Sequence, residues 1–222
     1  MPSPDVAGPP IPRGDHRLAL RAAQRHGFVL GGGNALLLHG IVDRPTADVD
    51  LFTDHEDRVR TAADVVRKAL TSAGMTVVEV RTDDGLGDAI YGLGDLMVEL
   101  EIGRGQDIAR LSLSCLPRAR EPVIMDIGPV MHLDDLIAWK VAAIINRREV
   151  RDYVDTAALL ERHSADELIR MARRVDEGLD DEDIRTVGRI IDRMPDWALA
   201  DYGVSSPSAA AALRRRFDEW PR

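Results

Sequence analysis

The chain has 222 residues, with 38 acidic and 29 basic side chains and a formal net charge of −9. This length can bury the core of one large domain or two small ones. The acidic balance argues against a general polyanion binder, and a nucleic-acid substrate would need a local basic patch, because phosphate contacts supply most of that affinity. Cys115 is the only cysteine, which excludes an intrachain disulfide and a cysteine-rich zinc site. A single cysteine is usual in a reducing compartment, so we expect a cytoplasmic protein.

The N-terminal residues 1–15 are rich in Pro and Gly. They lack the apolar core of a signal peptide, so a flexible tail is expected. No apolar run approaches the ~20 residues that a membrane helix needs. The longest, residues 137–145, is interrupted by Lys140, so we expect no membrane partner.

After the tail, helical and strand patterns alternate. Apolar spacing predicts helices over residues 18–26, 34–39 and 57–72, with Gly27 as a C-cap, and strands over 28–30, 47–52, 75–80, 89–93, 96–102 and 123–127. From residue 133 only helical spacing remains, over 133–146, 150–162, 165–175, 182–192 and 208–220. The sequence therefore predicts a mixed α/β (α+β) domain over 16–131 and a helical C-terminal domain over 132–222.

A glycine run follows the first predicted strand, and two aspartates lie in the second. Gly31, Gly32 and Gly33 let the backbone approach a phosphate where a β carbon would obstruct it, and their N–H groups can face the anion. Asp48 and Asp50 are two residues apart, so strand geometry points both carboxylates to one face. Such a pair suits a Mg²⁺ ion that is also held by a triphosphate. An ordinary flexible turn remains the alternative for the glycines alone.

Together these two elements resemble the nucleotidyltransferase superfamily, whose signature is a Gly-Gly or Gly-Ser turn followed by an Asp-x-Asp strand. The surrounding sequence looks closest to the AbiEii/AbiGii-type nucleotidyltransferase toxins of bacterial toxin–antitoxin systems. The resemblance covers residues 16–162 with motifs, and it implies a nucleotidyltransferase-fold mixed sheet with flanking helices. It also implies that Gly31 to Asn34 cradle phosphates, that Arg44 and Thr46 hold a phosphate, and that Asp48 and Asp50 are catalytic metal ligands. A surface arginine and a turn threonine are the alternatives for Arg44 and Thr46.

A third carboxylate is expected on a neighbouring strand, where members of the superfamily usually carry an acidic residue. Glu99 and Glu101 share one face of the strand predicted over 96–102. We favour Glu101 over Glu99 as the third metal ligand. A solvated outer face of the sheet is the alternative for both.

The helical half contributes a second group of candidate residues. Lys140 lies on a largely apolar helix, where a buried lysine needs an anionic partner, and the triphosphate is one candidate. The stretch resembles the toxins' second motif block, an inward lysine followed by an Arg-Asp-x-x-Asp helix. That resemblance makes Lys140 and Asp152 catalytic and matches Asp155 to the second acid. The alternatives are a snorkelling surface lysine for Lys140 and a helix N-terminal carboxylate for Asp152.

The resemblance implies an enzyme that transfers a nucleoside monophosphate from an NTP to an acceptor hydroxyl. It further implies a toxin that modifies the 3′ end of tRNA and is held in check by a cognate antitoxin. An RNA-facing basic patch could be formed by six arginines, for which solvated helix faces are the alternative: Arg147, Arg148, Arg151, Arg214, Arg215 and Arg216. An aminoglycoside-type nucleotidyltransferase acting on a small cationic acceptor, and a non-catalytic nucleotide-binding module, are the rival functions.

Overall fold

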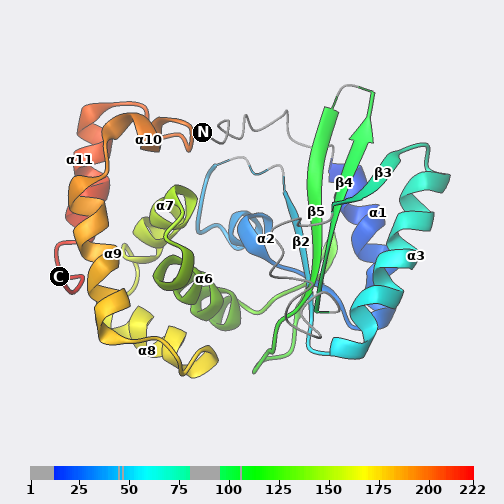
Figure 1. Ribbon diagram of the computed structural model, residues 1–222, viewed down its shortest axis with the longest axis horizontal. Coiled ribbons are helices and arrows are strands. Elements are labelled where there is room, and N and C mark those ends of the chain that lie inside the picture. Colours follow the sequence, from blue (N-terminus) through cyan, green and yellow to red (C-terminus); the bar gives the residue numbers. More distant parts are fainter. Residues whose placement is uncertain (1–12, 45, 47, 81–95, 106) are drawn as a thin grey trace. The chain divides into compact units, whose positions relative to one another are not determined.

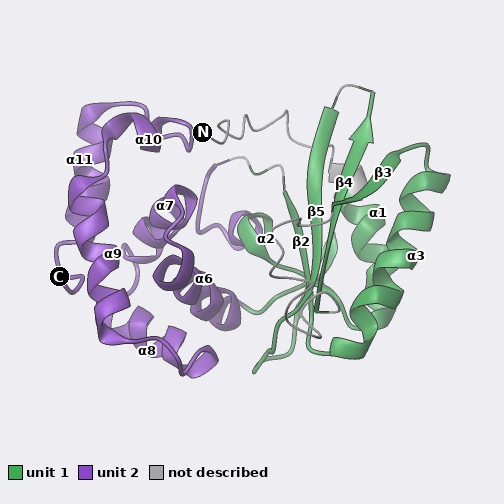
Figure 2. Ribbon diagram, viewed as in Figure 1, with its two compact units in different colours: residues 1–35, 45–132 green, residues 36–44, 133–222 purple. Residues whose placement is uncertain are grey.

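The computed structural model describes residues 13–44, 46, 48–80, 96–105 and 107–222, with side chains from residue 16 onward. Most of the expected tail and the strand predicted over 89–93 lie outside these residues. The chain divides into two compact units (Figure 2). The α/β unit comprises residues 1–35 and 45–132, and the helical unit comprises residues 36–44 and 133–222. The helical unit thus includes a short segment, 36–44, that precedes the second strand.

A seven-stranded mixed sheet forms the α/β unit, in the order β3-β4-β5-β2-β1-β7-β6. The strands are β1 (Val29–Leu30), β2 (Val49–Thr53), β3 (Thr76–Val80), β4 (Met97–Arg104), β5 (Asp107–Cys115), β6 (Val123–Met125) and β7 (Gly128–Val130). The pairs β1–β7 and β2–β5 are parallel, and the other neighbours are antiparallel. The mixed α/β fold predicted from the sequence is thereby confirmed.

Two helices cover one face of this sheet, α1 (Arg13–Ala23) and α3 (Val59–Ser72) (Figure 1). Strand alternation explains which face they cover, because Val98, Leu100 and Ile102 of β4 are buried while the residues between them are more exposed. Buried apolar residues of β2 and β5 continue the same face. The opposite face of β2, β5 and β4 carries the polar candidate residues.

Short turns bound the helices of this unit. A 3₁₀ turn, Gln24–His26, follows α1 and ends at Gly27, whose φ of 80° makes it the expected left-handed C-cap. A second 3₁₀ turn, Glu56–Arg58, leads into α3. The helix α2 (Gly32–Leu38) begins directly after the glycine run's first residue.

The helical unit is built around α6 (Leu133–Arg147), which is buried on most sides. The others are α7 (Val150–Leu159), α8 (Ala165–Val175), α9 (Asp181–Arg193), α10 (Asp196–Ala200) and α11 (Pro207–Arg216). Their starts follow from the sequence, since Ser164 forms a capping box with Glu167, and Asp180 and Ser206 accept from backbone N–H groups of α9 and α11. No helix in the described part of the chain is long and apolar enough to span a membrane.

Several elements of the structure differ from the predictions. Strand β5 was not predicted, although Ala109, Leu111 and Leu113 alternate with polar residues. The strand predicted over 123–127 is a hairpin of β6 and β7, because Gly128, with φ of 132°, follows the turn between them. The helix predicted over 208–220 ends at Arg216, and the short helix α10 was not predicted.

Candidate functional site

The glycine run lies against side chains of β2 and the residues leading into it. A β carbon at Gly31 would fall 2.3 Å from the ring of Phe52, and one at Gly32 would fall 1.7 Å from Oδ2 of Asp50. Gly32 also has a φ of 59°, which few other residues adopt. The N–H of Gly31 donates to the main-chain oxygen of Asp50 at 2.8 Å. Packing within the chain therefore requires glycine at positions 31 and 32. The contact of these glycines with phosphate stays a prediction.

Asn34 and Thr46 support the same turn. The buried amide of Asn34 donates to the main-chain oxygen of Asp48 at 2.6 Å, which fixes the backbone immediately before β2. A β carbon at Gly33 would lie 3.2 Å from Oγ1 of Thr46. The predicted nucleotide-binding residues of the α/β unit are thus brought together around the start of α2.

Asp50 lies in a row of polar residues that crosses three neighbouring strands. Its register partner on β5 is Ser112, and the partner of Ser112 on β4 is Glu99. The hydroxyl of Ser112 donates to Oδ1 of Asp50 at 3.2 Å. All three residues are half-buried and belong to the face that α1 and α3 leave uncovered. Ser112 was not predicted as a site residue, because β5 itself was missed.

The two candidate third carboxylates differ in their register. Glu101 pairs with Arg110, beyond the first paired residue of β2, and is exposed, whereas Glu99 shares the row of Asp50. Two strand spacings separate the backbones of Asp50 and Glu99, roughly 10 Å. Among the described residues, no group of three or more His, Cys, Asp or Glu side chains is spaced to hold a metal ion. The three-carboxylate site stays a prediction.

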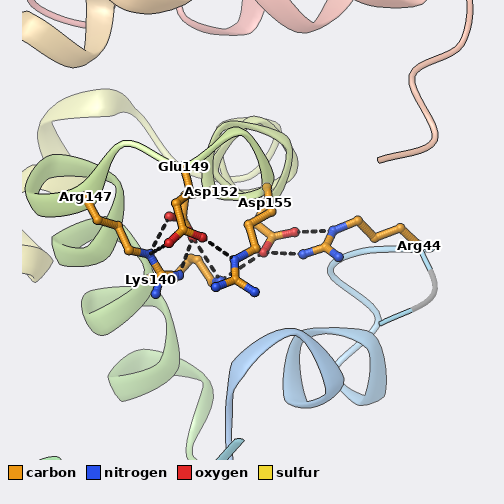
Figure 3. A network of polar contacts seen from close by, with 7 residues as sticks. Arg44, Lys140, Arg147, Glu149, Asp152 and Asp155 are labelled. Atoms are coloured by element: carbon orange, nitrogen blue, oxygen red, sulfur yellow. Dashed lines mark hydrogen bonds and ion pairs between the residues drawn. The ribbon is translucent and has the colours of Figure 1, made fainter. Parts of the chain in front are cut away.

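The helical unit contains a buried network of charged side chains (Figure 3). Lys140 of α6 is 8% exposed, and its Nζ lies 3.0 Å from Asp155 and 3.4 Å from Asp152, both of α7 and both fully buried. Arg44 donates to the two oxygens of Asp155 at 2.7 and 2.8 Å. Arg147 donates to the two oxygens of Asp152 at 2.8 and 2.9 Å. The anionic partners that Lys140 needs are therefore supplied by the chain.

Glu149, which precedes α7, joins the network through Arg147 and Arg151. Among the described residues, these contacts connect the cations of Arg44, Lys140, Arg147 and Arg151 with the carboxylates of Glu149, Asp152 and Asp155. Burial alone would raise the pKa of Asp152, but the hydrogen bonds from Arg147 and the charges of Lys140, Arg147 and Arg151 outweigh it and lower that pKa. Asp152 is therefore held as a carboxylate.

Most of the six predicted acceptor-binding arginines already have carboxylate partners. Arg148 pairs with Asp183, Arg214 with Asp196, and Arg216 with Glu161, in addition to the pairs of Arg147 and Arg151. Arg215 is exposed on α11, and its side chain makes no ion pair with the part of the chain that the structure describes. To bind phosphate, the paired arginines would have to contact the phosphate in addition to these carboxylates or exchange one for the other.

Comparison with known proteins gives one family and several similar folds. The family model described as "Nucleotidyl transferase AbiEii toxin, Type IV TA system" matches residues 17–219. MenT4, a nucleotidyltransferase toxin from Mycobacterium tuberculosis H37Rv, has a similar structure, with a TM-score of 0.62 at 18% identity over 92% of this chain and 80% of that one.

Two Helicobacter pylori structures are also similar. A putative nucleotidyltransferase gives a TM-score of 0.53 at 16% identity, covering 91% of each chain. The protein JHP933 gives a TM-score of 0.52 at 16% identity, covering 92% of this chain and 89% of that one. At these identities the solved structures show a shared fold. No curated protein matches the sequence.

Proposed function

The chain belongs to the family of AbiEii nucleotidyl transferase toxins of type IV toxin–antitoxin systems, and on this premise we propose that it transfers a nucleoside monophosphate to the 3′ end of tRNA with the help of Mg²⁺. As a nucleotidyltransferase it uses an NTP. In the proposed reaction the acceptor hydroxyl oxygen bonds to the α-phosphorus, the bond from the α-phosphorus to the bridging β-phosphate oxygen breaks, the hydroxyl proton passes to solvent water, and pyrophosphate leaves.

The observation that carries the proposal is the placement of Asp50. Its carboxylate lies over the α carbon of Gly32, at the first residue of α2, and accepts a hydrogen bond from Ser112. A carboxylate held at the start of a helix, beside a turn of three glycines, is suited to bring a cation to the phosphates that the turn receives. Asp48, two residues earlier, supplies the second carboxylate.

The donor chemistry of this pair fits Mg²⁺. Mg²⁺ prefers oxygen ligands and is usually bound by one or two carboxylates together with substrate phosphates, so Asp48 and Asp50 would hold it. When bound, the ion would neutralise charge on the phosphates and polarise the α-phosphate. For a further carboxylate, the register favours Glu99, because it shares the row of Asp50, whereas Glu101 is opposite Arg110.

Lys140 is proposed to stabilise negative charge on the triphosphate. Its ion pairs with Asp152 and Asp155 fix the ammonium group in place, and a pre-oriented cation requires little rearrangement as charge develops. Arg44 belongs to the same network through its two hydrogen bonds to Asp155.

The proposals of an antitoxin partner and an RNA acceptor are based on the family to which the chain belongs. The name of MenT4 describes a toxin, and toxins of this family are paired with antitoxins, so we propose a cognate antitoxin and action in the cytoplasm. The proposed RNA acceptor needs local positive charge on a chain of net charge −9. Arg215 is the best placed of the six arginines, because it is exposed and makes no ion pair within the described chain.

The test is a labelling assay with each of the four NTPs, labelled at the α-phosphate. Total tRNA, a set of aminoglycosides and a no-acceptor control are incubated with wild type and with Asp50→Asn. We expect label on tRNA with wild type, mapped to the 3′ end by nuclease digestion, and none with Asp50→Asn. Label at an internal position would overturn the 3′-end target, and equal labelling by both proteins would overturn the role of Asp50.

The same assay decides between the proposal and its rivals. The acidic surface favours a small cationic acceptor, so label on an aminoglycoside and none on RNA would establish the alternative acceptor with the same mechanism. NTP binding by calorimetry without transfer to any acceptor would favour a non-catalytic module. Metal dependence is tested by adding EDTA, which should abolish transfer, and restoring Mg²⁺, which should recover it.

A further inference from the structure

Ser112 of β5 is the side chain that contacts the proposed metal-binding carboxylate of Asp50. Its hydroxyl donates to Oδ1 at 3.2 Å. The other oxygen, Oδ2, lies 1.7 Å from the position that a β carbon of residue 32 would take. Oδ2 of this carboxylate therefore lies beside the backbone of Gly32, and Oδ1 accepts a hydrogen bond from the hydroxyl of Ser112.

This arrangement limits the freedom of the carboxylate. An aspartate has two side-chain torsions, and the terminal one is broad when nothing contacts the oxygens. Here a hydrogen bond to Oδ1 sets that torsion. A hydrogen bond to a charged oxygen is stronger than a hydrogen bond between two neutral groups. The bond leaves Oδ2, at the first residue of α2, oriented away from Ser112.

The position of Ser112 in the sheet follows from the pairing of the strands. Parallel pairing of β2 with β5 places Ser112 opposite Asp50, and antiparallel pairing of β4 with β5 places Glu99 on its other side. Strand β5 therefore separates the backbones of these two acidic residues by two strand spacings, roughly 10 Å. The only described hydrogen bond of its hydroxyl is the one to Asp50.

We propose that Ser112 is a positioning residue that orients the Asp50 carboxylate for its bound metal ion. The inference rests on the proposed function, because it assumes that Asp50 is a metal ligand. The hydroxyl of Ser112 then contributes to the reaction, whereas a purely structural serine would contribute only to the packing of β5. The same strand offers a matched control, since Ser114 lies on the same face, is also half-buried, and faces Phe52 instead of a carboxylate.

Four variants test the proposal: Ser112→Ala removes the hydroxyl, Ser112→Thr retains it, Ser114→Ala is the control, and Asp50→Asn removes the carboxylate's charge. The first measurement is direct metal affinity, read as Mn²⁺ binding by electron paramagnetic resonance in the presence of a non-hydrolysable NTP analogue. We expect Ser112→Ala to bind Mn²⁺ roughly tenfold more weakly, the size of effect that one hydrogen bond to a charged group supports. Ser112→Thr and Ser114→Ala should bind it as wild type does.

The second measurement is steady-state transfer as a function of Mg²⁺ and NTP concentration. Ser112→Ala should lower kcat and raise the Mg²⁺ concentration for half-maximal activity, while the KM for NTP measured at saturating Mg²⁺ changes less than twofold, because the metal ligand is misplaced and the phosphate-binding turn is intact. Ser112→Thr should recover most of kcat. Urea denaturation of all four variants separates these effects from loss of folded protein.

The outcomes separate the two proposals. Loss of Mn²⁺ affinity in Asp50→Asn but not in Ser112→Ala would overturn the positioning role and leave the metal role of Asp50 in place. Unchanged Mn²⁺ affinity in Asp50→Asn would overturn the proposed function of Asp50, and the role of Ser112 with it. Equal effects of Ser112→Ala and Ser114→Ala, or failure of Ser112→Thr to recover activity and affinity, would also reject the positioning role.

Discussion

Arg44 and Asp155, 111 residues apart in the sequence, form a bidentate ion pair within the helical unit, with N–O distances of 2.7 and 2.8 Å. The Asp155 side chain is fully buried, and that of Arg44 is 12% exposed. This ion pair connects the end of the segment 36–44 to α7. Lys140 contacts the same carboxylate at 3.0 Å, so Asp155 connects the Arg44 segment to α6 as well.

Removal of Arg44 should destabilise the helical unit. Arg44→Ala leaves the buried carboxylate of Asp155 with fewer donors, and we expect the free energy of unfolding to fall by roughly 2 kcal/mol. Arg44→Lys should recover only part of this, because one ammonium group cannot replace a planar two-pronged donor. The measurement is urea denaturation. Arg216→Ala, which breaks an exposed pair with Glu161, is the control and should cost under about 1 kcal/mol; equal losses would contradict a special role for Arg44.

A β carbon at Gly32 should be more damaging than one at another glycine of positive φ. Gly74, after α3, has a φ of 84° and no atom within 4 Å of an added β carbon, so Gly74→Ala should cost only the roughly 1–2 kcal/mol of the left-handed backbone. Gly32→Ala adds a collision with Asp50. We expect a larger loss of stability, measured in urea, and loss of transfer activity. Similar behaviour of the two variants would show that Asp50 moves aside freely.

The sequence predicted the parts of the fold that local patterns specify. Gly27 was predicted as a C-cap because left-handed backbone favours glycine, and the structure has it there. The pairing that builds the candidate site is a long-range property. Ser112 and Asp50 are 62 residues apart, and the predictions lacked β5, although its alternating residues Ala109, Leu111 and Leu113 indicate a strand with one buried face.

The charged residues were less predictable than the elements. The apolar spacing around Lys140 indicated a buried lysine that needs an anion, and the structure supplies Asp152 and Asp155 as partners. Only the pairing of helices could show this, because a sequence pattern gives the face of a helix and not the neighbour it meets. The catalytic and binding roles of these residues stay predictions.

The buried carboxylate of Asp152 should make stability depend on acid pH. Its pKa is lowered in the folded protein, so the stabilisation is fully present above the ordinary aspartate pKa of about 3.9 and is lost as the pH falls below that value toward the folded pKa. The difference in unfolding free energy between wild type and Asp152→Asn should therefore be largest near neutral pH and shrink below about pH 4. Urea titrations at several pH values measure it. Asp64→Asn, on the exposed side of α3, controls for the loss of one charge, and a difference for Asp152→Asn that grows toward low pH would contradict the assignment.

Arg215 should contribute more to RNA binding than its neighbours on α11. It is exposed and makes no ion pair within the described chain, whereas Arg214 donates to Met194 and Asp196 and Arg216 pairs with Glu161. Because an unpaired arginine gives up no carboxylate when it meets a phosphate, Arg215→Ala should lower the slope of log affinity against log salt by about one unit. Its stability in urea should match that of wild type, while Arg214→Ala should lose stability.

A filter-binding titration of labelled tRNA at several salt concentrations measures this slope. Asp48→Asn is the matched control, because it removes a proposed metal ligand and should abolish transfer while leaving the salt slope as in wild type. The triple replacement of Arg214, Arg215 and Arg216 by Ala should weaken tRNA binding further, yet leave calorimetric NTP binding intact, because none of the three is among the proposed nucleotide-binding residues. If Arg215→Ala and the triple variant both bind tRNA with the affinity and slope of wild type, α11 is not part of the RNA-binding surface, and the positive charge that RNA requires must be supplied by other residues.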